Sequence, residues 1–300
     1  MSVPTHQAPK RAGRTRERGT WTPQLSRRAG ILLVTPLVLA VLLLVVYPIL
    51  KLLYDSLTVG AGPGNYVDAV SSGAIRRAFV HTLLTSAAVT ALSVGIGASL
   101  AWTLRRARHR VATALIWAAV LLPFWMGVVV KNYAFALLFA REGLVNEVLL
   151  GLGLVDRPVQ LLYTTTAVIV GMTYTMIPYA VLALYPSMSA VDLELMNAAD
   201  GLGASRRRTF TSILLPLVMP GFIAAAAIVF AISIGFYVTP VLLGGAQAPF
   251  IATVIGDDIF TFFDYPRAAA ASVLLLAIAL LAIGAALKAV GLKAIRGGLG

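Results

Sequence analysis

Few side chains in this sequence are placed for covalent chemistry. It contains no cysteine, which excludes disulfides, thiolate metal sites and a cysteine nucleophile. Its three histidines, His6, His81 and His109, lack the i, i+4 spacing of metal ligands, and neither H-E-x-x-H nor G-x-S-x-G occurs. The phosphate-binding pattern G-x-x-x-x-G-K-[ST] is also missing. We therefore expect no catalysis and no cofactor on this chain, and any ATP and magnesium ion on a partner.

The most informative spacing is in a polar and basic stretch between two long apolar segments. Ser189 followed by Asp192 is a capping-box pattern, which predicts a helix that begins near Ala190. Glycines at the other end, Gly201 and Gly203, predict where this helix stops. The predicted helix is short.

Helical spacing sorts the residues of this short helix onto two faces. One face is apolar and contains Val191, Leu195, Ala198, Ala199 and Leu202. The other is mainly polar and contains Glu194, Asn197 and Asp200, with Leu193 among them. Such a helix can lie flat on a membrane surface.

The composition is that of a polytopic membrane protein. Of 300 residues, 59% are hydrophobic and 12% are charged, and the mean hydropathy of +0.88 excludes an ordinary soluble domain. Basic residues lie at the ends of apolar runs instead of gathering on one face. The net charge of +12 therefore indicates membrane topology, with no nucleic-acid partner.

Six segments supply the roughly 20 mainly apolar residues that a spanning helix needs. They are residues 30–54, 79–104, 111–133, 162–186, 213–240 and 267–290. The predicted fold is all-α, with a basic tail at 1–28, a six-helix transmembrane domain at 29–296 and a short tail at 297–300. The first segment is too long for a secretory signal and is interpreted as an uncleaved anchor.

Charge placement predicts the orientation of these spans. Seventeen of the 24 basic residues fall on the side of the N-terminal tail, so both termini are predicted to be cytoplasmic. The outer segments contain seven basic and eight acidic residues. The outer face is therefore the natural side for a cation to approach.

A longer pattern runs through the polar stretch and into the next span. It consists of Asn197-Ala198-Ala199, Gly203, Phe210, Ile213, Leu215-Pro216 and Pro220-Gly221. This order resembles the coupling-loop signature of ABC importer permeases, which begins Glu-Ala-Ala. Asn197 stands at the glutamate position, with Glu194 one turn earlier.

The resemblance implies that residues 187–212 form a coupling loop whose helix docks into a groove on a cytoplasmic ATPase dimer. The implied coupling residues are Glu194, Asn197, Ala198, Ala199, Asp200, Gly203, Phe210 and Pro216. An ordinary cytoplasmic loop, whose arginines only stop membrane transfer, is the alternative.

Two further stretches, Leu122-Pro-Phe-Trp125 and Leu242-Leu-Gly-Gly245, look like segments of spermidine/putrescine permeases. This resemblance implies a type I importer in the inner membrane, with a second, unlike permease subunit and an extracytoplasmic solute-binding protein. Related permeases for ferric iron, thiamine or phosphonates share the layout. A secondary transporter is a further alternative, but it usually needs ionisable residues in mid-span, and the predicted spans are almost free of them.

A polyamine is a flexible polycation, so its route should offer carboxylates and aromatic faces. The candidates near the outer side are Trp125, Tyr133, Glu142, Tyr237, Asp257 and Asp258. Alternatively, these acids are solvated loop residues or contacts to a binding protein.

Overall fold

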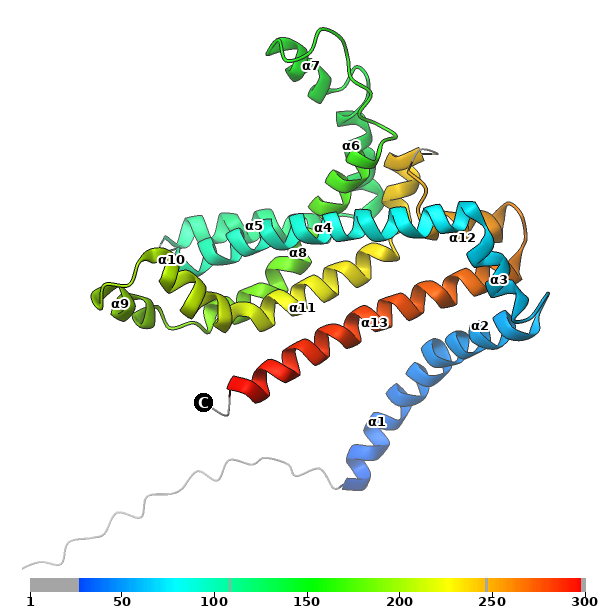
Figure 1. Cartoon of the computed structure of the whole chain (residues 1–300), viewed down its shortest axis with the longest axis horizontal. Coiled ribbons are helices and arrows are strands. Elements are labelled where there is room, and N and C mark those ends of the chain that lie inside the picture. The colour runs from blue at the N-terminus through cyan, green and yellow to red at the C-terminus, as the bar shows by residue number, and fades with distance from the viewer. Residues whose placement is uncertain (1–26, 108, 246–247, 298–300) are drawn as a thin grey trace, which may run out of the picture. The chain divides into compact units, whose positions relative to one another are not determined.

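The computed structural model describes residues 27–107, 109–245 and 248–297, and within them every regular element is a helix (Figure 1). The all-α prediction is confirmed for this part of the chain. Most of the predicted basic tail, residues 1–26, and the last three residues lie outside it. Arg27, predicted to belong to the tail, begins the first helix.

The chain divides into two compact units, Met1–Leu50 and Lys51–Gly300. In the first unit, helix α1 (Arg27–Val41) continues through a π-helical turn, η1 (Leu42–Val46). Helix α2 (Tyr47–Thr58) follows without a break. The residues from Val34 to Thr58 are long and apolar enough to cross a membrane, as predicted for the first span.

Four long helices pack together in the second unit: α4 (Gly73–Arg106), α8 (Thr165–Ser189), α11 (Leu215–Ile234) and α13 (Tyr265–Gly297). Small residues let them approach closely. A Cβ atom on Gly97 of α4 would lie 2.8 Å from Ala180 Cβ of α8. One on Gly221 of α11 would lie 2.5 Å from Ser187 Oγ. Lipid tails are as apolar as the helices, so the hydrophobic effect does not drive helices together inside a membrane. Close contacts of this kind supply much of the packing energy instead.

Shorter helices join and flank this bundle. They are α3 (Gly64–Ser71), α7 (Leu144–Gly151), α9 (Leu193–Gly201), α10 (Arg206–Thr209), the π-helical turns η2 (Phe210–Leu214) and η3 (Pro240–Gly244), and α12 (Ile251–Phe260). Figure 1 shows α9 and α10 at one end of the bundle and α12 with α3 at the other. Helices α7 and α12 lie between predicted spans, α7 after the third and α12 after the fifth.

The prediction of one continuous span over 111–133 is wrong. Helix α5 (Arg110–Trp125) ends where Met126 and Gly127 are extended, and α6 (Val128–Leu138) leaves at 103° to it. This break could not be predicted from the apolar run, because side-chain hydropathy carries no information on whether two backbone residues are extended. Five described helices, counting joined segments, could each cross a membrane, and this bent pair would be the sixth.

Helices α6 and α7 extend sideways from the bundle (Figure 1). Asn146 closes the loop after α7, because its side chain accepts from Val159 N and donates to Val159 O and Ala140 O. This amide is 1% exposed. When a loop of this kind lies at membrane depth, its backbone N–H and C=O groups need hydrogen-bond partners within the protein.

Candidate functional site

The predicted coupling helix is present as α9, but it begins later than its sequence indicated. Helix α8 continues to Ser189, whose hydroxyl donates to Pro186 O at 2.9 Å. Asp192 caps α9 instead, since its Oδ1 accepts from Glu194 N at 2.9 Å. The capping-box assignment to Ser189 is therefore wrong, and the helix starts at Leu193 instead of near Ala190.

The end of α9 lies where the glycines predicted it. The helix ends at Gly201, and Ala204 N donates to Ala199 O at 3.0 Å, the six-residue closure of a Schellman motif. Gly203 has φ +80°, a left-handed conformation that other L-residues rarely adopt. No atom lies within 4 Å of the position of an added Cβ, so backbone conformation, and not space, requires this glycine.

One side of the coupling segment is anchored to the transmembrane helices. Val191 is 4% exposed, and its carbonyl accepts from Arg105 Nη2 of α4 at 3.0 Å. Val191 packs in one buried cluster with Met188 of α8 and with Leu214 of η2. A displacement of this segment would therefore act on the adjacent ends of α4, α8 and η2.

The other side of α9 is exposed. Leu195 is 50% exposed and Leu202 is 90% exposed, and Ala198 is exposed with them. Glu194 and Asn197 are exposed as well. Only Val191 and Ala199 of the predicted apolar face are buried, so most of that face does not pack against this chain.

A cavity of about 530 Å³ lies behind the coupling segment. Its walls come from α4, α8, α9, η2 and α11, and include Trp102, Met196 and Phe222. Arg106 also lines it, with the guanidinium carbon 4.6 Å from the centre of the Trp102 ring. Phe210 of η2 also lies on the wall of this cavity. Pro216, the second residue of α11, is exposed.

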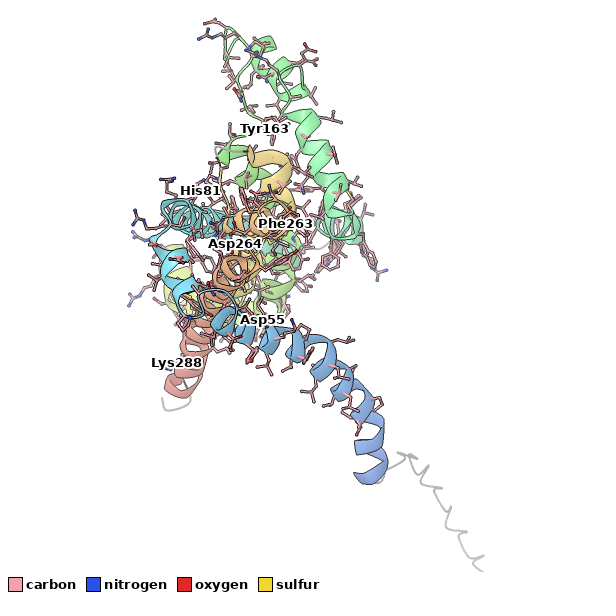
Figure 2. All side chains as sticks on the ribbon, turned by 90° about the vertical axis from the view of Figure 1, so that its right-hand side faces the viewer. Asp55, His81, Tyr163, Phe263, Asp264 and Lys288 are labelled. Atoms are coloured by element: carbon pink, nitrogen blue, oxygen red, sulfur yellow. The ribbon has the colours of Figure 1, made fainter. Side chains whose placement is uncertain are left out.

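At the opposite end, the predicted acids differ sharply in their surroundings. Asp258 is fully buried, and both of its oxygens accept from the Arg267 guanidinium. Asp264, labelled in Figure 2, also lies near Arg267, at 3.5 Å from Nε. Asp257 is exposed on α12. The Asp258 carboxylate is thus committed to an ion pair within the chain.

The predicted aromatic residues are only partly brought together. The ring of Tyr237 lies against the backbone of α12, because a Cβ on Gly256 would be 2.8 Å from its Cε2. Trp125 and Tyr133 are 82% and 58% exposed on α5 and α6. Glu142 is exposed in the turn between α6 and α7.

The structure adds a residue that the sequence analysis counted only as an outer charge. Lys131 of α6 is 5% exposed and lines a cavity of about 300 Å³ at the break between α5 and α6. Tyr237 lines the same cavity, together with Tyr179 of α8. The adjacent polar residues Lys131 and Asn132, inside an otherwise apolar run, were the available signal. Among the described residues, no cluster of His, Asp or Glu could hold a metal ion.

Comparison with known families places this geometry in context. A family model described as "Binding-protein-dependent transport system inner membrane component" matches residues 12–291. The chain is 34% identical over 196 residues to the spermidine/putrescine transport system permease protein PotB of Escherichia coli, covering 65% of this chain and 71% of PotB. It is 30% identical over 220 residues to the sulfate transport system permease protein CysT of Salmonella typhimurium, covering 72% and 77%.

Solved structures share the fold. A chain of a bacterial alginate ABC transporter, crystallised with an alginate pentasaccharide-bound periplasmic protein, superposes with a TM-score of 0.71 at 21% identity. The match covers 86% of this chain and 93% of that one. A chain of the inward-facing MetNI methionine ABC transporter gives a TM-score of 0.54 at 18% identity, with 73% and 96% coverage.

Proposed function

The chain belongs to the family of binding-protein-dependent transport system inner membrane components, and from this premise we propose how it couples ATP to solute movement. It is a multi-pass membrane protein and a permease subunit of an ABC importer. We propose that α9 docks on a cytoplasmic ATPase dimer. A second, unlike permease subunit would complete the pathway, and an extracytoplasmic protein would deliver the solute.

The observation that carries this proposal is the two-sided character of α9. One side packs through Met196 against the buried cluster, and Val191, just before α9, ties this segment to α4, α8 and η2 with the Arg105 hydrogen bond. The other side exposes Leu195 and Leu202 beside the polar Glu194 and Asn197. An apolar patch with a polar rim is typical of a protein interface, and burying such leucines contributes about 1.5–3 kcal/mol each. This arrangement supports docking better than a solvated loop does.

Force transmission follows from the connections of α9. When the ATPases close on ATP, with its magnesium ion, a docked α9 moves with them. The buried cluster of Val191, Met188 and Leu214 carries this displacement to α8 and α11, because close-packed side chains compress little. The cavity behind η2 allows the helix ends to shift. Alternating access of the pathway is the expected result.

Charge placement supports the orientation that we propose. Arg105 and Arg106 at the end of α4 lie on the same end of the bundle as α9 and α10. Basic residues are enriched on the cytoplasmic side of membrane proteins, so this end faces the cytoplasm. Both termini are then cytoplasmic.

A polyamine such as spermidine or putrescine is the solute that we propose. The support is the similarity to PotB permeases and the aromatic walls of the cavity beside Tyr179 and Tyr237. Asp257, exposed on α12 next to Gly256, would offer a carboxylate at the outer end. Asp258 would act indirectly, by holding α12 and α13 together.

Reconstitution tests this function. The complex that copurifies with the tagged chain is placed in proteoliposomes with its binding protein, and uptake of radiolabelled putrescine, spermidine and sulfate is measured. The proposal predicts uptake of the polyamines only, dependent on ATP and magnesium on the ATPase side. Uptake that persists without ATP would indicate a secondary transporter, and uptake of sulfate alone would exclude the polyamine assignment.

A further inference from the structure

Lys131 is a buried cation that is held without an acidic partner. The side chain is 5% exposed, and Nζ donates to Pro123 O at 2.9 Å. Within the described part of the chain, no Asp or Glu forms an ion pair with it. An ammonium group has three hydrogen-bond donors, and a lone buried charge is costly at membrane depth. Such a residue calls for a functional explanation.

The carbonyl group that holds Lys131 belongs to the end of a broken helix. Helix α5 ends at Trp125, so the carbonyl of Pro123 is one of the last four, which lack partners inside the helix. These groups carry about half a negative charge at a helix C-terminus. The 103° bend sends α6 away so that Lys131, in its first turn, reaches back to that terminus. The break thus creates a site that favours a cation.

The rest of the cavity also has the character of a cation site. Its volume is about 300 Å³, and no carboxylate lines it. Four aromatic side chains and a threonine surround it with Lys131: Phe124, Tyr179, Phe236, Tyr237 and Thr175. Ring faces and hydroxyl oxygens can contact an ammonium group.

We propose that Lys131 occupies a subsite for a primary ammonium group of the transported polyamine, and that the solute displaces it. This inference rests on the proposed polyamine function. A lysine side chain is a four-carbon chain that ends in a primary ammonium, and putrescine has the same chain with an ammonium at each end. The cavity therefore already holds the chemical group that it would receive. The bound lysine fills the subsite when no solute is present.

In this proposal, the Lys131 ammonium and the solute ammonium compete for the same subsite. The positive charge of Lys131 opposes a second cation in the same cavity, and its Nζ blocks the Pro123 carbonyl. Lys131→Gln keeps an N–H donor for that carbonyl but removes the charge. The subsite should then receive an ammonium group more readily.

Equilibrium binding of radiolabelled putrescine tests this, using the purified complex with its partner permease and ATPase in lipid nanodiscs, without binding protein. We expect Lys131→Gln to bind putrescine about tenfold more tightly than the unaltered complex. The uncharged isostere 1,4-butanediol should not compete. Lys131→Arg, which keeps the charge, should show no gain. Lys288→Gln removes an exposed lysine from α13 (Figure 2) and should also leave the Kd unchanged.

An unchanged or weaker putrescine affinity in Lys131→Gln would overturn the inference. If the variant does not assemble, a structure of the unaltered complex with putrescine decides: a putrescine nitrogen about 3 Å from Pro123 O supports displacement, and a retained Lys131 contact overturns it. Putrescine uptake by the unaltered complex is measured in parallel. Its absence would refute the proposed function, whereas normal uptake with an unresponsive Lys131→Gln would refute this inference alone.

Discussion

Two short helices at opposite ends of the bundle, α9 and α12, are similar in length but differ in how they are held. In α12, Ile251 and Asp258 are fully buried. Ile251 N donates to Thr82 Oγ1 at 2.9 Å, and Asp258 is paired with Arg267. In α9, Leu195 is 50% exposed, and Leu202, directly after the helix, is 90% exposed. Helix α12 is held by contacts inside the chain, whereas part of the apolar face of the α9 segment stays exposed.

This difference separates a structural role from a coupling role. The contacts of α12 fix the turn into α13. Substitutions that break these contacts should therefore lower the free energy of unfolding of the chain. The exposed face of α9 contributes little to the stability of the chain alone, because its leucines remain exposed. Changes there should appear as lost transport. Substitutions at α12 should therefore change mainly the stability of the chain, and substitutions at α9 should change mainly transport.

The largest expected effect is at the end of α9. Gly203→Pro should reduce uptake by roughly 100-fold or more, because proline fixes φ near −65° and cannot adopt the observed +80°. Membrane insertion should be normal, since the turn lies outside the spans. Radiolabelled putrescine uptake and membrane yield are the measurements.

Gly201→Ala is the matched control for that substitution. Gly201 ends α9, has no positive φ, and has open space around an added Cβ. Alanine there should preserve uptake. Normal uptake by Gly203→Pro would contradict the requirement for this turn in coupling.

A smaller loss, this time of stability, is expected at α12. Asp258→Asn should lower the free energy of unfolding by about 2 kcal/mol, below the usual cost of breaking a buried pair because Arg267 is one-third exposed. Thermal unfolding of the purified chain in detergent measures this. Asp257→Asn, at an exposed neighbour, should change stability by less than about 0.5 kcal/mol. Equal losses of stability in the two variants would contradict a structural role for Asp258.

The smallest expected effect is at the exposed face of α9. Leu202→Gln should lower uptake about tenfold, the equivalent of losing part of a leucine burial at the ATPase, while the melting temperature stays the same. Leu202→Met should retain uptake, because it keeps the apolar surface. A melting temperature that falls together with uptake would show that Leu202 stabilises the chain instead of docking it.

Much of the coupling region could be predicted because local backbone requirements determine it. Gly203 must be glycine for its positive φ, and the pair of glycines therefore predicted the end of α9. The start of α9 was misplaced because Ser189 and Asp192 are both good capping residues, and only the length of α8 decides between them.

The cavity at Lys131 could not be predicted from the same kind of information. It depends on two extended residues, Met126 and Gly127, inside an apolar run that reads as a single span. Its walls come from α5 and α6, from α8 and from the segment before η3, and these three regions are distant in the sequence. The ion pair of Asp258 likewise depends on how α12 turns back onto α13. Tertiary placement, and not local preference, determines these sites.

Cross-linking between α9 and the ATPase tests the central claim most directly. The chain has no cysteine, so Leu202→Cys provides a single thiol on the exposed face of α9. With a thiol-to-amine cross-linker in native membranes, the variant should join to the ATPase, and mass spectrometry should place the partner lysine beside a surface groove. Leu281→Cys, on an exposed position of α13, is the control and should not join to it. Equal cross-linking of both variants, or none at Leu202→Cys in an ATP-dependent complex, would contradict the docking of α9.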